Sequence, residues 1–170
     1  VIERSMKKHL KGQALQHENI ISDNLPPELL DNDQILAQTL SQGQVVLGYA
    51  FDFSGRNIPV KPDQIQPLNP VIVKTEGAKD LFECLKTASN VVPPLSTLTR
   101  NKVQTGFFNT SADHDGILRA TPLLMAWNGK VYPNLSLATL LEALGRPQVA
   151  VKINKGGIES LKIGPATIPL

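Results

Sequence analysis

The residues best suited to chemistry gather in one short stretch in the second half of the chain. Asp113-His114-Asp115-Gly116 places an imidazole between two carboxylates, and Ser111 lies two residues before it. Serine, histidine and aspartate can form a nucleophilic site when the histidine takes the serine proton. A turn histidine flanked by aspartates is more often simply solvated, so we expect no catalytic residue here. A hydrolase fragment is the least favoured of the functions that stay open.

The same aspartates suggest a calcium site, but the neighbouring residues supply too few ligands. An EF-hand loop spreads its oxygen ligands over about 12 residues and ends in a bidentate glutamate. After Gly116 no acidic side chain follows until Glu142, so we expect neither a metal nor another cofactor. Asp113 or Asp115 should instead accept backbone N–H bonds in a turn where Gly116 takes a positive φ. Arg119 should pair with one of these aspartates.

Composition and the remaining motifs exclude several further classes. The chain has 170 residues, 41% of them hydrophobic, which predicts a globular domain rather than a disordered tail. Its 17 basic and 15 acidic side chains leave a net charge of +2, which argues against a nucleic-acid partner. No nucleotide-binding glycine loop, GxSxG elbow or HExxH motif is present. The single Cys84 cannot form an internal disulfide, and its apolar neighbours indicate a small buried hydrophobe.

The first half of the chain offers fewer regular elements to position the acidic stretch. Ile35, Leu36 and Leu40 recur at helical spacing until Gly43 ends the pattern, which predicts a helix capped near residue 31 or 32. The apolar run 45–51 is typical of a strand buried on both faces. Shorter elements are expected beyond it: a loop at 52–70, a strand at 71–73, a helix at 80–88 and at most an edge segment at 90–98.

The second half is more regular. Runs at 106–109 and 117–125 flank the Asp-Gly turn, which predicts an antiparallel hairpin that presents the acidic stretch. Two further hairpins are expected around Asn128-Gly129 and Gly156-Gly157, and between them a helix at 134–144 that Asn134 caps. The sequence therefore predicts an α/β fold, with a mixed β-sheet, packed helices and antiparallel hairpins in the C-terminal half.

Taken in order, these segments resemble a known family, the CHASE domain of the second type, whose name abbreviates cyclases/histidine kinases associated sensory extracellular. The resemblance covers about residues 25–170. Its most specific part comprises Gly106-Phe107-Phe108-Asn109, Asp113-His114-Asp115-Gly116-Ile117, Arg119 and Pro122-Leu123. Flanking segments that are similar to the family's helices and strand are Leu30-Asp31-Asn32-Asp33, Leu36-Ala37, Val45-Val46-Leu47-Gly48, Tyr132-Pro133 and Leu135-Ser136-Leu137-Ala138.

This resemblance implies a sensory input domain and not an enzyme. Such domains lie in the periplasmic or extracellular part of bacterial transmembrane receptors whose outputs are adenylate or guanylate cyclases or histidine kinases. The implied partners are a small molecule or an envelope stimulus and a second copy in a homodimer, and the parent protein is anchored in the membrane. The residues we would test for ligand binding, or for a structural turn, are Asn109, Asp113, Asp115, Gly116 and Arg119. A lobe of a secreted solute-binding protein stays open as the alternative.

The resemblance also bears on domain organisation. Residues 1–24 are polar and irregular and are expected to be a leader or linker, while residues 25–170 form one sensor domain. The family usually begins with a strand ending in an acidic residue and a serine, then a Trp-Pro-rich loop and a βα unit, and residues 1–24 contain none of these. We therefore expect the family's first βα unit to be missing. A chain without an initiator Met that ends in a strand-like run is expected to be a piece of a longer protein.

Overall fold

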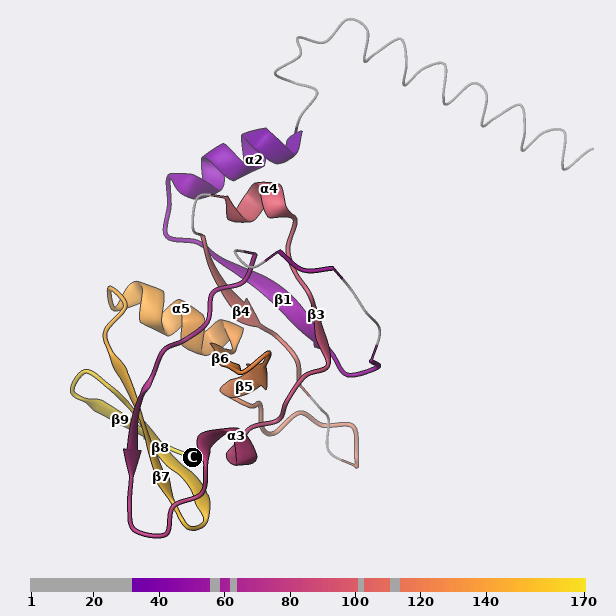
Figure 1. Ribbon diagram of the computed structural model, residues 1–170. Helices are drawn as coiled ribbons and strands as arrows, with labels where there is room; N and C mark the ends of the chain where they lie inside the picture. Colours follow the sequence, from indigo (N-terminus) through magenta and orange to yellow (C-terminus); the bar gives the residue numbers. More distant parts are fainter. Residues whose placement is uncertain (1–31, 56–58, 62–63, 101–102, 111–113) are drawn as a thin grey trace, which may run out of the picture.

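The computed structural model describes residues 32–55, 59–61, 64–100, 103–110 and 114–170, and Figure 1 shows how their elements are arranged. The fold is α/β, as the sequence predicts. In chain order the elements are α2 (Asn32–Ser41), β1 (Val46–Asp52), β2 (Val71–Lys74), α3 (Leu81–Cys84), β3 (Asn90–Val92), α4 (Ser96–Thr99), β4 (Gln104–Phe107), β5 (Leu124–Trp127), β6 (Lys130–Pro133), α5 (Leu135–Ala143), β7 (Val149–Asn154), β8 (Gly157–Ile163) and β9 (Ala166–Pro169).

The described strands form three small sheets. β1 is the central strand of the first, with β3 antiparallel on one side and β4 parallel on the other. The second sheet has the order β2-β7-β8-β9, in which β2 runs parallel to β7 and the later strands alternate in direction. β5 and β6 form a separate hairpin. The second sheet therefore combines hairpins with a strand from a distant part of the chain, whereas both pairings of the first sheet join distant segments.

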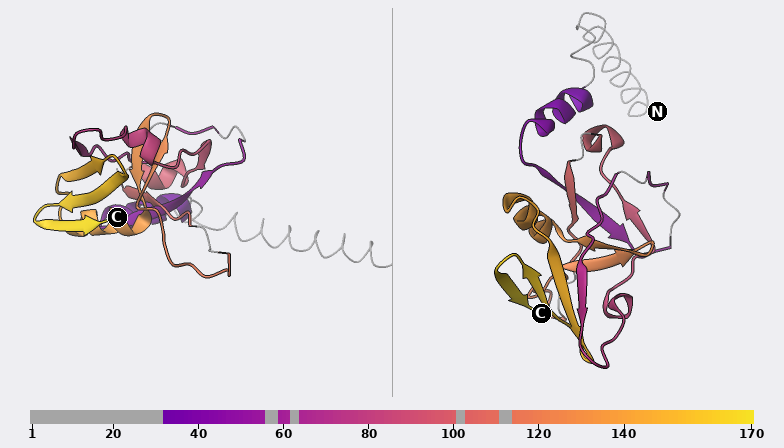
Figure 2. Two further views of the ribbon diagram at one scale, coloured as in Figure 1. Left: turned by 90° about the horizontal axis from the view of Figure 1, so that it is seen from below. Right: turned by 60° about the vertical axis from the view of Figure 1, so that its left-hand side comes forward.

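Two hydrophobic cores hold these sheets together. The aromatic core centres on Phe51, whose ring lies 5.3 to 5.7 Å from the rings of Tyr49, Phe107 and Tyr132. The aliphatic core packs α5 and α3 against β7 and β8, and its members include Leu137, Leu141, Val149, Val151 and Leu161. Figure 2 shows α5 between the β1 sheet and the β7 sheet. This helix therefore lies between the two larger sheets of the domain.

Several local predictions are confirmed. The β5–β6 hairpin turns through Asn128 (φ 47°) and Gly129 (φ 68°), both in the left-handed region that a two-residue turn of this type requires. β7 and β8 form the expected third hairpin. α5 begins after Asn134, whose Oδ1 accepts the N–H of Leu137 at 2.8 Å. Residues 90–92 form an edge strand, since β3 has a neighbour on one side only.

The predicted hairpin over residues 106–124 is wrong. β4 pairs in parallel with β1, and β5 pairs with β6, so the two runs do not meet as strands. Ile117 and Leu118, expected to lie in the second strand, are 53% and 58% exposed and face no core. Pro122 also lacks the N–H that a ladder position would need. Residues 108–123 are a long connection, and the described part of it contains no strand.

In the first half of the chain the elements lie near their predicted positions, but several of their residues are less buried than expected. α2 is a helix as predicted, but Ile35 and Leu36 are 40% and 45% exposed, and its buried residue is Ala37. The helix expected at 80–88 is only α3, because a capping box starts it at Asp80 and the chain is already extended at Leu85. β1 is not buried along its whole length on both faces, because its first three residues are half-buried or exposed.

Candidate functional site

Gly106 lets the start of α5 rest directly on the β1–β4 sheet. Gly48 and Gly106 are neighbours in the register of these strands. A Cβ atom on Gly106 would lie 2.6 Å from the Cα atom of Leu135 and 2.8 Å from the carbonyl oxygen of Asn134. No side chain fits at that distance, so the close approach of strand and helix requires glycine at position 106.

The first turn of α5 is held by its capping residue. Asn134 is only 3% exposed. Its side chain accepts the Leu137 N–H, its carbonyl accepts the Ala138 N–H at 2.8 Å, and its own N–H donates to the Leu123 carbonyl at 2.9 Å. Phe107 also forms a parallel bridge with Asn134. The start of the helix is therefore fixed on the sheet and on the end of the 108–123 connection.

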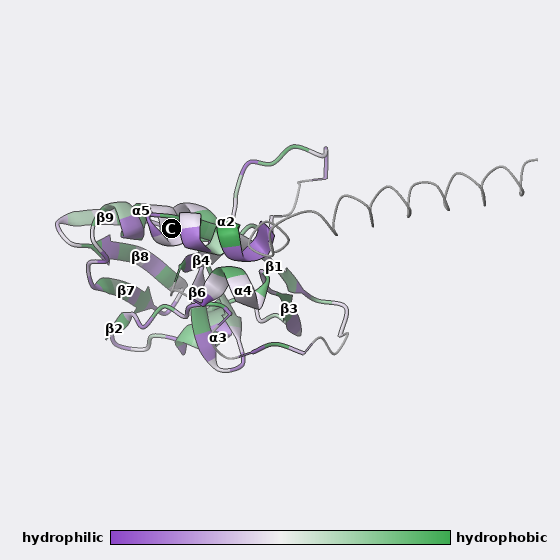
Figure 3. Cartoon of the chain, turned by 90° about the horizontal axis from the view of Figure 1, so that it is seen from above, coloured by the Kyte–Doolittle hydropathy of each residue, from purple (hydrophilic) through white to green (hydrophobic). Residues whose placement is uncertain are grey.

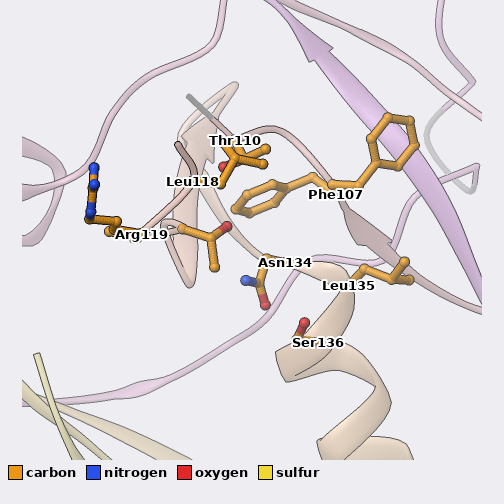
Figure 4. Close-up of a pocket in the computed structure, with 10 residues that line it drawn as sticks. Phe107, Thr110, Leu118, Arg119, Asn134, Leu135 and Ser136 are labelled. Carbon is orange, nitrogen blue, oxygen red and sulfur yellow. The ribbon is translucent and has the colours of Figure 1, made fainter. Parts of the chain in front are cut away.

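A pocket of about 390 Å³ opens between this helix start and the connection. Its volume falls within the range of small-molecule sites, and its walls are mainly apolar with a few hydroxyl and amide groups, as in such sites. Figure 4 shows Thr110 and Leu118 facing Asn134 and Ser136, while the Arg119 side chain points away from Asn134. The lining residues are Phe107, Phe108, Thr110, Leu118, Arg119, Ala120, Thr121, Asn134, Leu135 and Ser136.

The Asp-Gly turn is described from His114 onward. The Asp115 carboxylate accepts two hydrogen bonds from the Arg119 guanidinium, at 2.9 and 2.7 Å, and one from the Ile117 N–H at 3.1 Å. These bonds, that of Arg119 above all, lower the pKa of Asp115 below its ordinary value. Gly116 has the expected positive φ of 81°. The predicted turn and ion pair are thus present for Asp115, whereas Asp113 lies outside the described residues.

Asn109, also part of the family signature, lies beside β1 and does not line the pocket at the start of α5. Its amide oxygen accepts the Phe51 N–H at 2.6 Å, and its amide nitrogen donates to the Phe51 carbonyl at 2.9 Å. The side chain therefore takes the place of a strand residue beside β1, two residues after β4 ends. Sequence reasoning missed this contact; the available signal was an amide, which is both donor and acceptor, at the end of a strand-like run.

Thr110 also lines a second pocket. It measures about 340 Å³ and is lined by Phe53, Lys86, Asn109, Thr110, Pro122 and Met125. The Lys86 ammonium lies 4.3 Å from the centroid of the Phe53 ring, a cation–π contact. Asn109 and Arg119, two of the expected site residues, therefore line different pockets.

Other predicted reactive groups have ordinary surroundings. His114 is exposed, and Ser111 lies outside the described residues. Cys84 is half-buried against the aliphatic core, and its thiol donates to the Asp80 carbonyl at 3.2 Å. In the described ranges, no three His, Cys, Asp or Glu side chains are grouped so that they could hold a metal ion. Nor does that part of the chain contain a helix long and apolar enough to cross a membrane.

The fold and this site define an α/β domain that offers a ligand-sized pocket where a capped helix meets a mixed sheet. The family model of the CHASE2 domain matches residues 9–170. The chain therefore belongs to the CHASE2 family, a family of extracellular, non-catalytic sensory domains found in cyclase and kinase receptors. No curated protein and no solved structure matches the chain significantly.

Proposed function

We propose that this chain is the extracytoplasmic input domain of a bacterial transmembrane receptor whose output is a nucleotide cyclase or a histidine kinase. The observation that carries the proposal is the CHASE2 match over residues 9–170. The reading frame of the parent protein tests it. An apolar span before the domain, with further spans and a cyclase or kinase domain after it, is expected; a parent without membrane spans would overturn the proposal.

We further propose that the stimulus is a small molecule bound at the start of α5. Support comes from the pocket itself, because Phe107, Phe108 and Arg119 of the family signature line it together with Asn134 and Ser136 of the helix start. Signalling would then be a population shift between two packings of the pocket walls. A stimulus must bind one packing about tenfold better, about 1.4 kcal/mol, to produce a useful response.

Adjacent residues of the connection provide a matched test of the pocket. Leu118 lines it and is 58% exposed, whereas Ile117 does not line it and is 53% exposed. A small-molecule library is screened by thermal denaturation of the 170-residue chain. A ligand at about 100 times its dissociation constant should add about 2.7 kcal/mol, which raises Tm by about 5–10 °C in a domain of this size.

The two residues are then each replaced by tryptophan. Leu118→Trp should fill the pocket and abolish the shift, while Ile117→Trp should keep it. If both variants lose the ligand-induced rise in Tm equally, or both retain it equally, the ligand binds elsewhere.

A further inference from the structure

β2 forms an open edge of the four-stranded sheet. Figure 3 shows it at the margin of the molecule, and among the described strands its only neighbour is β7. Val71, Ile72 and Val73 are 49%, 37% and 46% exposed, so both faces of the strand are accessible as well as its edge. Three consecutive β-branched residues on an open edge are a template for pairing with another strand, which native sequences usually prevent with charges or proline.

The direction of the backbone groups shows which residues could pair. The Thr75 N–H donates to the Ile153 carbonyl of β7 at 3.0 Å. Backbone groups alternate sides along a strand, so those of Val71 and Val73 also face β7, and those of Ile72 and Lys74 face outward. Within the described part of the chain, no backbone hydrogen bond uses the outward groups of these two residues.

We propose that β2 is a dimer interface, at which a second copy of this chain pairs antiparallel with β2 about a two-fold axis through Val73. In this register Ile72 of one copy lies opposite Lys74 of the other, and each such pair exchanges two backbone hydrogen bonds. Four bonds form in all, because both outward-facing residues of both copies are used. The arrangement is self-complementary, as a two-fold interface requires, and joins the sheets of the two copies.

The charges at this edge are compatible with two identical strands. The Lys74 ammonium lies 3.3 Å from the Asp80 carboxylate of its own copy. Each copy therefore brings Lys74 to the interface already paired with its own Asp80. The two lysines that the two-fold axis brings to the interface do not act as unpaired like charges. A heterologous acidic or basic partner would find no excess charge on β2 to bind, which favours a second copy as the occupant.

The interface is small, and its size sets the strength that we expect. Four residues from each copy are far fewer than the roughly 20–30 a side of a stable complex, so the dimer should be weak in solution. Tethering two copies to one surface raises their effective concentration to about the millimolar range, at which weak pairing becomes populated. The proposal does not depend on which ligand the pocket binds.

Cysteine cross-linking of the 170-residue chain tests the register directly. The background is Cys84→Ser, which removes the native thiol. Val73 meets its own symmetry mate in a non-hydrogen-bonded pair, where Cα atoms lie about 4.5 Å apart, within the range of a disulfide. Val71 has the same face and nearly the same exposure, but its mate lies four residue steps away, about 14 Å. Val73→Cys should form disulfide-linked dimers at least about tenfold faster than Val71→Cys under mild oxidation.

A second variant separates specific pairing from random collision. Ile72→Pro removes an outward N–H without removing a bond to β7, so the domain should stay folded and Val73→Cys should then cross-link no faster than Val71→Cys. Thermal denaturation of the variants verifies that they are folded. Equal rates for the two cysteines in the parent background, or no effect of Ile72→Pro, would overturn the proposal. If the thiol introduced by Val73→Cys were protected from a thiol reagent in the monomer, the proposal would also fail, since the edge would then be covered by the chain itself.

Discussion

The contact between Gly106 and the start of α5 makes a sharp prediction about stability. Gly106→Ala places a Cβ atom 2.6 Å from the Leu135 Cα and 2.8 Å from both the Asn134 carbonyl oxygen and the Leu135 nitrogen. Carbon atoms in contact normally lie about 3.5–4.0 Å apart, so the helix start must move by about 1 Å. All three atoms belong to the backbone of a capped helix, and no rotamer change can relieve the overlap.

The expected cost follows from two opposing effects. Overpacking at a rigid site destabilises by about 1–3 kcal/mol. Alanine also lowers the conformational entropy of the unfolded chain relative to glycine, which raises the free energy of unfolding by about 0.4–1 kcal/mol. The φ angle at Gly106 lies outside the left-handed region, so no backbone strain adds to the balance. We therefore expect a net loss of about 1–2 kcal/mol, measured by urea denaturation, and a Tm lower by about 2–8 °C.

Two other glycines provide graded controls. At Gly43 the nearest atom to an added Cβ is the Val45 side chain at 3.8 Å, an ordinary contact, so only the effect on the unfolded chain remains and Gly43→Ala should raise the free energy of unfolding by about 0.4–1 kcal/mol. At Gly48 the added atom would meet the Phe108 ring at 3.1 Å, and that ring is 57% exposed and can turn away. Gly48→Ala should therefore lie between the other two. Equal unfolding free energies for Gly106→Ala and Gly43→Ala would show that α5 does not rest on β4.

Three further predictions concern single side chains. The Tyr49 hydroxyl is buried without a hydrogen-bond partner in the described structure, so Tyr49→Phe should raise the free energy of unfolding by about 1 kcal/mol; a loss in urea denaturation would reveal a partner. Asn109→Ala should lower stability by about 1–3 kcal/mol because both backbone groups of Phe51 lose their partner, and Asn109→Asp, which places a carboxylate oxygen against the Phe51 carbonyl oxygen, should cost at least as much. Arg119→Ala should raise the pKa of Asp115 towards its ordinary value in an NMR titration. Because this pKa is lowered in the folded state, the Asp115 contribution to stability is present above the ordinary pKa and is lost as the pH falls through the lowered one. An unchanged Asp115 titration would contradict the ion pair.

The elements that could be predicted are those that a few neighbouring residues specify. Asn128-Gly129 can supply two positive φ angles wherever it occurs, so its hairpin needs no distant partner. α5 likewise carries its own cap and its own leucine spacing. The Asp115–Arg119 pair is of the same kind, because the two charges lie four positions apart in the chain.

The elements that could not be predicted depend on distant partners. Two strand-like runs around an Asp-Gly turn favour a hairpin locally, yet β4 pairs with β1, from which it is separated by two short helices and two strands. The Asn109 amide extends this pairing to Phe51, 58 residues away, and Gly106 of β4 leaves room for α5 on the same sheet. The pocket is missed for the same reason, since its walls come from the end of β4, the connection and the start of α5.

The pocket has two walls, the start of α5 and the 108–123 connection, and moving the connection costs less free energy than moving the helix. This difference bears on how the domain would signal. The α5 wall is fixed by the Asn134 cap and by backbone contact with Gly106. The facing wall holds Leu118, which is largely exposed, and an exposed Asp115–Arg119 pair, and such a pair contributes only about 0–1 kcal/mol. A tenfold population shift needs about 1.4 kcal/mol, which exceeds the cost of breaking that pair. Displacing α5 would break the Asn134 cap, which alone costs about 0.5–2 kcal/mol, and also the bond from the Asn134 N–H to the Leu123 carbonyl. A bound ligand would therefore rearrange the connection against a stationary helix, and substitutions of the exposed Leu118 or Arg119 should alter signalling with little effect on stability.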